Sequence, residues 1–288
     1  MVSQSKGDER NNLEYKKRYV AFLDVLGFKN LVLKRSDKQL KDYLDIVESS
    51  LEEIKEIDGK SIIDSIVVSD SVVLVMKCDR ARIDRFRHFC VAIGLIQSRL
   101  AVRGLWLRGA ISMGDISFCN RLKQIIGKPY ITAYELEQTK AIYPRVILDT
   151  EIIEELDCKD SQELIRDIND KTFCNWSFPI LYDPNQVPRA YRSNVNTVFI
   201  DYINPIIGDS ETSSPGSTRT LDEVIKTIED NINADAKIAE KYRWLATYLR
   251  EKLLVQNKEE QYSDSISTLE QILLNFESYQ SNYGLIGS

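Results

Sequence analysis

An apolar run that ends in a single carboxylate constrains the fold of this chain most. Residues 19–28 read YVAFLDVLGF, so Asp24 follows five apolar or aromatic residues and Gly27 comes three positions later. A buried strand that passes through a tight turn into a helix leaves backbone N–H groups free, and proteins hold phosphates with such groups. We therefore expect a phosphate-binding turn made by Val25, Leu26, Gly27 and Phe28.

A second carboxylate, Asp70, lies between two valine-rich runs, residues 62–68 and 72–75. This pattern predicts a β-hairpin with Asp70 at its tip. Taken separately, Asp24 can simply cap a helix and Asp70 can simply turn a hairpin, because Asp is common at both positions. If the two strands are neighbours, however, the carboxylates meet and can share divalent cations that bridge to phosphates in the turn.

The remaining patterns predict an α+β fold. Apolar residues spaced by three and four favour a helix over residues 81–102. Strands are expected over residues 105–113, 116–118, 146–148 and 196–203, and a helix over residues 151–156. The alternation of strand, helix, hairpin, helix and hairpin indicates a ferredoxin-like, antiparallel-rich sheet with helices on one face.

Domain limits follow from composition along the 288 residues. We expect a disordered N-terminus over residues 1–14, a main domain over 15–207, a flexible linker over 208–219 and a C-terminal helical arm over 220–288. A capping box at residues 220–223 predicts the start of a helix that runs to about residue 255. A last helix is expected over residues 265–276, and the arm shows no motif with a chemical role.

Composition excludes several classes of function. The net charge is −6 and no run of Lys or Arg is long enough to bind nucleic acid, which favours small ligands. No apolar run approaches a membrane span, and the polar start lacks a signal sequence, so a cytoplasmic protein is expected. The five cysteines are odd in number and scattered, and His88 is the only histidine, which argues against a disulfide framework or a zinc site.

Two later segments complete a family pattern. They are residues 107–114 (LRGAISMG) and residues 126–137 (IGKPYITAYELE). With the Asp24 turn and the Asp70 hairpin, their order resembles the catalytic domain of class III nucleotidyl cyclases, over about the first half of the chain. The resemblance implies two Mn²⁺ or Mg²⁺ ions per site held by Asp24, Asp70 and the Val25 backbone carbonyl. It also implies a homodimer in which Arg108 and residues 127–137 of one subunit face the carboxylates of the other.

The chain departs from the purine cyclases of that family at the positions that read the base. Ile66 and Gln124 stand where those enzymes have Lys and Asp. The positions of the transition-state Asn and Arg hold Ile131 and Glu135. Either the protein is inactive, or another cation such as Arg108 or Lys128 stabilises the developing phosphate charge.

These departures make the chain similar to one branch of the family, the pyrimidine cyclases of bacterial Pycsar anti-phage systems. The resemblance implies a phosphorus–oxygen lyase that converts UTP to 3′,5′-cyclic UMP and pyrophosphate, with a separate effector that responds to the product. Three alternatives stay open: a cytidylate cyclase acting on CTP, a purine cyclase, and a catalytically inactive nucleotide-binding regulator.

Overall fold

A computed structural model describes most of the chain. The described residues are 14–33, 37–58, 63–78, 82–170, 179–186, 197–207, 217–232, 236–255 and 260–282. Residues 1–13 of the predicted disordered N-terminus and most of the predicted linker, residues 208–216, lie outside them.

A six-stranded sheet with the order β2-β3-β1-β4-β5 forms the centre of the molecule, and β6 pairs with β4 in parallel. The strands are β1 (Tyr15–Val25), β2 (Ile63–Val68), β3 (Ser71–Lys77), β4 (Leu107–Cys119), β5 (Gln124–Ile126) and β6 (Val146–Leu148). All the other pairs are antiparallel. With helices between β1 and β2 and between β3 and β4, this order is ferredoxin-like. The α+β prediction is confirmed.

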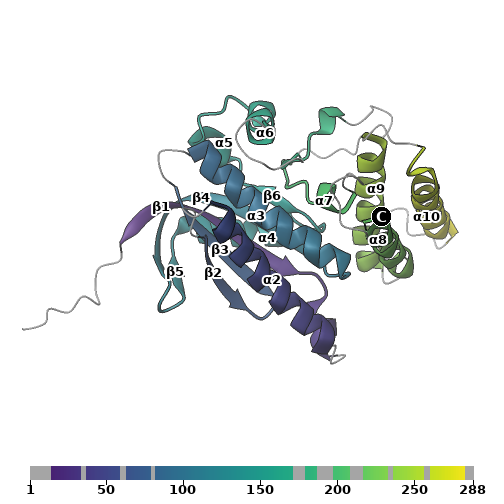
Figure 1. Cartoon of the computed structure of the whole chain (residues 1–288), viewed down its shortest axis with the longest axis horizontal. Helices are drawn as coiled ribbons and strands as arrows, with labels where there is room; N and C mark the ends of the chain where they lie inside the picture. The colour runs from purple at the N-terminus through teal and green to yellow at the C-terminus, as the bar shows by residue number, and fades with distance from the viewer. Residues whose placement is uncertain are drawn as a thin grey trace, which may run out of the picture.

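Helices α2 (Asp37–Asp58) and α3 (Arg82–Val102) cover one face of the sheet (Figure 1). Alternate residues of β1 point to this face, because side chains in a strand alternate sides. They are Tyr19, Ala21 and Leu23, which join the core made with the apolar stripe of α3. The predicted helix over residues 81–102 is therefore confirmed.

The other face of the sheet is covered by α4 (Lys128–Thr139), so the prediction of helices on one face is wrong. Val20 and Phe22 of β1 form a second apolar cluster there with Ala133 of α4. Phe22 also meets the Tyr134 ring edge-on, with the centroids 5.2 Å apart. The continuous apolar run from Tyr19 to Leu23 of β1 explains this result, since both faces of such a strand need cover.

Three helices at the C-terminal end lie together beyond one end of the sheet (Figure 1): α8 (Ser217–Asn231), α9 (Ala236–Val255) and α10 (Ser263–Asn282). The single helix predicted from residue 220 to residue 255 is wrong, because it is two helices and the first begins at Ser217. The first helix ends at Asn231, and Asn is a poor helix former.

A buried polar network ties α9 to the segment before the helical arm. Lys252 Nζ donates to Asp201 Oδ2 over 2.5 Å, and the Tyr248 hydroxyl donates to Asp201 Oδ1 over 2.5 Å. Glu251, also on α9, accepts a hydrogen bond of 2.6 Å from the Tyr182 hydroxyl. Buried charges are tolerated only when they are paired in this way. The arm is therefore packed against the sheet-containing part of the chain.

Shorter elements complete the described part: α1 (Phe28–Leu33), α5 (Glu151–Glu155), α6 (Ser161–Asn169), a 3₁₀ turn (Pro184–Gln186) and α7 (Asn204–Ile207). The two strands predicted over residues 105–118 are one strand, β4. Gly114 joins them with φ 151°, a conformation open to glycine that lets the pairing with β1 continue to Ser117. Of the predicted strand over residues 196–203, the described residues 197–203 form only isolated bridges at Phe199 and Ile200. In the described part of the chain, no helix has the length and apolar character to span a membrane.

Candidate active site

The register of β1 and β4 places Asp24 directly opposite Arg108. Arg108 Nε lies 3.2 Å from Asp24 Oδ2 and 2.7 Å from Glu137 Oε1, on the face covered by α4. Glu137 is fully buried, and its other carboxylate oxygen accepts from Gln138 Nε2 over 2.6 Å. One guanidinium therefore holds two carboxylates that come from different elements.

The β2–β3 hairpin brings Asp70 to the end of β1. Asp24 is paired with Ser71 in the register of β1 and β3, and the Val25 N–H donates to the Asp70 carbonyl over 3.0 Å. Ser69 begins the two-residue turn with φ 58°, in the left-handed region that tight turns use. The sequence-based prediction that Asp24 and Asp70 lie side by side at one end of the sheet agrees with this geometry.

The charges at this end of the sheet are not balanced by protein groups. Burial raises the pKa of the Asp24 carboxyl; the Arg108 guanidinium opposes this effect and the nearby Asp70 charge adds to it. Burial likewise raises the pKa of Glu137, against Arg108 and together with Asp24 and Asp70. Carboxylates crowded in this way are stabilised by an additional cation.

A hydroxyl group without a partner faces the same carboxylates. Tyr43 of α2 is buried, and its hydroxyl makes no hydrogen bond within the described residues. Burial, and then the charges of Asp70 and Asp24, raise the pKa of Tyr43 well above its usual value, so it is a neutral hydroxyl at physiological pH. An unpaired buried hydroxyl beside two carboxylates leaves polar capacity for a water or a ligand.

The donor set fits a divalent cation that arrives with a phosphate ligand. Among the described residues, no group of three or more His, Cys, Asp or Glu side chains is arranged to hold a metal alone. Mg²⁺ is usually bound by one or two carboxylates, with waters and substrate phosphates completing the shell. Asp24 and Asp70 supply such a pair, with the Val25 carbonyl next to Asp24 in the chain.

The turn after β1 is less open than the sequence predicts. The Val25 N–H is bonded to Asp70, and the Leu26 N–H donates to the Trp106 carbonyl over 2.8 Å. The prediction that four N–H groups are free is therefore wrong for Val25 and Leu26. Gly27 adopts φ 76° and Phe28 begins α1, and no backbone hydrogen bond from either N–H group is found among the described residues.

The other predicted site residues lie away from this cluster. Ile66 is packed in the apolar cluster with Val20 and Phe22, and Gln124 is exposed on β5. Lys128 pairs with Glu151 over 3.1 Å, with both side chains exposed. It is separated from Glu137 by nine residues of α4, or about 13 Å at the rise of an α-helix. Ile131 and Glu135 are exposed on the same helix.

That Arg108 faces the carboxylates of another subunit stays a prediction; within its own chain it lies beside Asp24. The cause is the register of β1 and β4, which puts the two residues in one antiparallel pair. Cross-strand neighbours of opposite charge interact directly in such a pair.

Sequence reasoning missed two residues near this cluster, Glu137 as a ligand of Arg108 and Lys241 on α9. The charges of Arg108, Asp24 and Glu137 are close enough to Lys241 to shift its pKa. A signal was present in the sequence, because Lys241 interrupts an apolar helical face with Ile238, Tyr242 and Leu245. All four residues line a cavity of about 400 Å³ next to the β1–α1 turn.

Comparisons with known proteins give structural similarity only. No protein-family model matches the sequence, and no curated protein matches it. The guanylyl cyclase Cya2 is similar with TM-score 0.38 and 13% identity, over 70% of this chain and 98% of that one. The adenylyl cyclase CyaB from P. aeruginosa has TM-score 0.39 and 16% identity, over 65% and 94%. A bacterial light-regulated adenylyl cyclase has TM-score 0.40 and 12% identity, over 73% and 99%. These similarities are too distant to carry a functional argument, which rests on the site itself.

Proposed function

We propose that this protein is a nucleotidyl cyclase. It converts a nucleoside triphosphate to the 3′,5′-cyclic monophosphate and pyrophosphate. The observation that carries the proposal is the contact between the ends of β1 and β3, where the Val25–Asp70 hydrogen bond holds Asp24 and Asp70 at the mouth of the Gly27 turn. Two adjacent carboxylates beside a turn that offers N–H groups suit a metal-bound triphosphate.

The reaction requires attack of the ribose 3′-oxygen on the α-phosphorus. A new O–P bond forms, the bond from the α-phosphorus to the β-phosphate oxygen breaks, and pyrophosphate leaves while the 3′-hydroxyl proton is released. Mg²⁺ or Mn²⁺ ions, two per site, held by Asp24, Asp70 and the Val25 carbonyl, would lower the pKa of the 3′-hydroxyl and offset the phosphate charge.

The residues of the chain have separate roles in this scheme. Arg108 fixes the orientation of the Asp24 carboxylate and balances the negative charge of the buried Glu137. The N–H groups of Gly27 and Phe28 bind a phosphate oxygen. Arg108 and Lys128 are the cations proposed to stabilise charge in the transition state, Arg108 within the chain and Lys128 only from a second subunit.

We propose UTP as the substrate, with CTP as the alternative. Ile66 is apolar and packed in a cluster, and Gln124 is neutral, so neither reproduces the charged pair that reads a purine. A site without those partners discriminates strongly against ligands that need them. By the resemblance to Pycsar cyclases, the cyclic product would be a messenger in anti-phage defence and would act on a separate effector.

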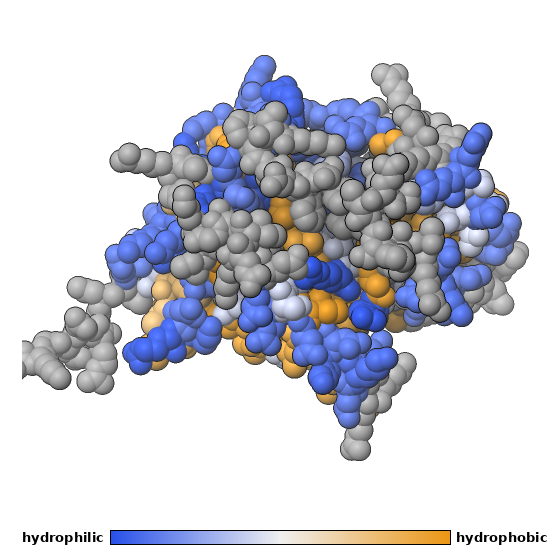
Figure 2. Space-filling view, in the orientation of Figure 1, coloured by the Kyte–Doolittle hydropathy of each residue, from blue (hydrophilic) through white to orange (hydrophobic). Residues whose placement is uncertain are grey.

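A homodimer is proposed because a group of apolar side chains is exposed on α4 and on the sheet beside it. They are Val67, Val68, Ile126, Ile131 and Tyr134. Figure 2 views the face of α2 and α3, and hydrophobic surface shows along its lower edge, where β2 and β5 extend past the helices in Figure 1. Exposed apolar surface of this kind is typical of protein interfaces. A second copy of the chain would cover it.

The alternative is an inactive nucleotide-binding regulator, which the apolar Ile131 and the acidic Glu135 favour. Incubation of the purified protein with each of the four nucleoside triphosphates and Mn²⁺, followed by mass identification of the products, separates the possibilities. Cyclic UMP or cyclic CMP supports the proposal. Cyclic AMP or cyclic GMP as the main product refutes the pyrimidine assignment, and triphosphate binding without any cyclic product supports the regulator.

A further inference from the structure

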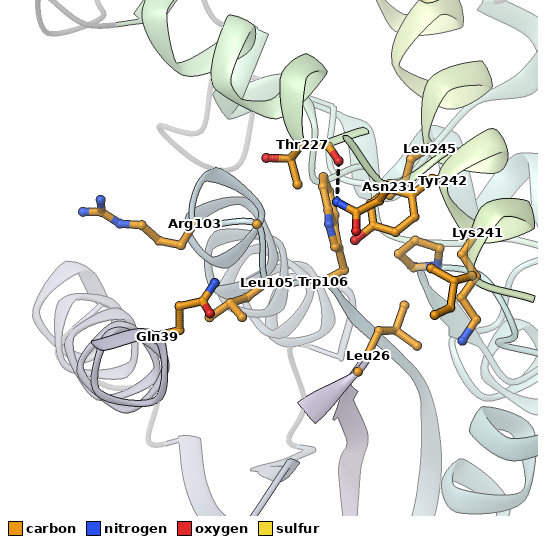
Figure 3. A pocket seen from close by; sticks show the side chains of 14 residues that line it. Leu26, Gln39, Arg103, Leu105, Trp106, Thr227, Asn231, Lys241, Tyr242 and Leu245 are labelled. Carbon is orange, nitrogen blue, oxygen red and sulfur yellow. Dashed lines mark hydrogen bonds between the residues drawn. The ribbon is translucent and has the colours of Figure 1, made fainter. Parts of the chain in front are cut away.

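A cavity beside the candidate site is lined by residues of the sheet-containing part of the chain and by residues of the C-terminal helical arm. Leu26 and Gly27 of the β1–α1 turn lie on one side, Trp106 lies before β4, and Lys241 and Tyr242 of α9 close the other side. Figure 3 shows Lys241 extending from α9 away from Tyr242, toward the end of the cavity formed by Leu26. The volume is about 400 Å³, which is enough for a group of the size of a diphosphate.

Lys241 is a partly buried cation without a carboxylate partner. It makes no ion pair within the described residues, whereas the nearby Arg108 already binds both Asp24 and Glu137. Burial lowers the pKa of Lys241, and the Arg108 charge lowers it further, against the attraction of Asp24 and Glu137. The lining of the cavity holds two cations, Arg103 and Lys241, and no carboxylate, so the cavity suits an anion.

The turn needs such a cation. The N–H groups of Val25 and Leu26 donate to the carbonyls of Asp70 and Trp106. The backbone of the turn therefore offers a triphosphate only the N–H groups of Gly27 and Phe28. Two N–H groups do not compensate the several negative charges of a triphosphate. A Lys beside Gly27 supplies a mobile point charge of the kind that phosphate sites use.

We propose that Lys241 binds the terminal phosphates of the substrate and that the cavity between the β1–α1 turn and α9 is their subsite. The C-terminal helical arm is then part of the substrate site of the same chain. The identity of the ligand as a nucleoside triphosphate rests on the proposed function. The subsite itself requires only a polyphosphate.

Binding of inorganic tripolyphosphate with Mg²⁺, measured by isothermal titration calorimetry, tests the subsite without turnover. Lys241→Met should weaken binding by roughly tenfold to a hundredfold, the usual effect of losing a charged hydrogen bond. Lys241→Arg should retain most of the affinity, because it keeps the positive charge. The matched control is Lys226→Met on the exposed face of α8, which should bind as the wild type does.

Steady-state kinetics separate this inference from the proposed function. If the enzyme turns over and Lys241→Met changes neither KM nor kcat, the inference is wrong and the cyclase proposal stands. If the wild type forms no cyclic product but tripolyphosphate binding depends on Lys241, the subsite stands and the cyclase proposal fails. Lys241→Gln, a smaller change, carries the same test if Lys241→Met does not melt near the wild-type temperature; equal tripolyphosphate affinity for Lys241→Gln and the wild type overturns the inference.

Discussion

Arg108 Nε lies 3.2 Å from Asp24 Oδ2 and 2.7 Å from Glu137 Oε1, so a single guanidinium connects the end of β1 with the buried side of α4. Because Asp24 is a proposed metal ligand, this link makes the geometry of the metal site depend on the packing of α4. Residues that orient a ligand in this way are usually as important to a metal site as the ligand.

Replacement of either metal carboxylate should abolish turnover and leave the fold intact. Asp24→Asn and Asp70→Asn each remove a charge that the cations need but keep the shape of the side chain. Product formation and the melting curve are the two measurements. Asp115→Asn, on an exposed position of β4, is the control. Near-normal product formation by either variant with an unchanged melting curve would rule out the metal assignment.

Arg108→Met should both inactivate and destabilise the protein. It leaves Glu137, which is fully buried, without its cation, and removal of one partner of a buried pair costs about 3–5 kcal/mol. Urea unfolding measures the loss. The double variant Arg108→Met/Glu137→Gln should recover most of the stability but none of the activity. Equal stability of Arg108→Met and the wild type would show that Glu137 is neutral or solvated.

Glu137 should also make stability depend on pH. Burial raises the pKa of this carboxyl above its value in the unfolded chain, so the folded state binds the proton more tightly. Stability from this group is therefore present at low pH and is lost as pH rises through the raised pKa. The variant Glu137→Gln does not titrate at this position. The melting temperature of the variant minus that of the wild type should therefore increase as the pH rises from about 4 to 7. Glu135→Gln, at an exposed position of the same helix, is the control, and a flat difference for Glu137→Gln contradicts the assignment.

Lys252→Met should destabilise the docking of the helical arm. It leaves Asp201 buried with only the Tyr248 hydroxyl bond, and the expected cost is about 3–5 kcal/mol. Proteolysis of the arm under native conditions, together with urea unfolding, measures it. Lys226→Met is again the exposed control. Wild-type stability of Lys252→Met would mean that the buried pair is not what holds α9.

The elements of the site could be predicted where the signal was local. Asp24 follows one short apolar run and Asp70 precedes another, and such continuous runs bounded by turn residues predict buried strands. The place of Lys241 could not be predicted in the same way. The position of Lys241 follows from the packing of α9 against a turn more than two hundred residues earlier in the sequence. A local periodicity cannot predict a contact between residues so far apart in the chain.

The hydrogen bonds of the turn illustrate a second limit. The sequence shows that residues 25–28 leave a strand, but not that Trp106 offers its carbonyl to Leu26. Such a bond depends on how closely the loop before β4 approaches β1. Backbone groups near the surface find whichever partner the tertiary structure supplies.

The last prediction concerns assembly. Lys128 is far from the Asp24 of its own chain, so a role in catalysis requires a second subunit, with two equivalent sites across a twofold axis. Activity per subunit should then fall on dilution below the dimer dissociation constant. Mixing inactive Asp24→Asn and Lys128→Met chains should restore about a quarter of the wild-type activity, because random pairing makes half the dimers mixed and each mixed dimer has one intact site. Arg108→Met should not complement Asp24→Asn if Arg108 serves only to orient its own Asp24, since the regenerated Asp24 then lacks that residue. A protein that stays monomeric in sedimentation and keeps full specific activity would show that one chain provides every catalytic group.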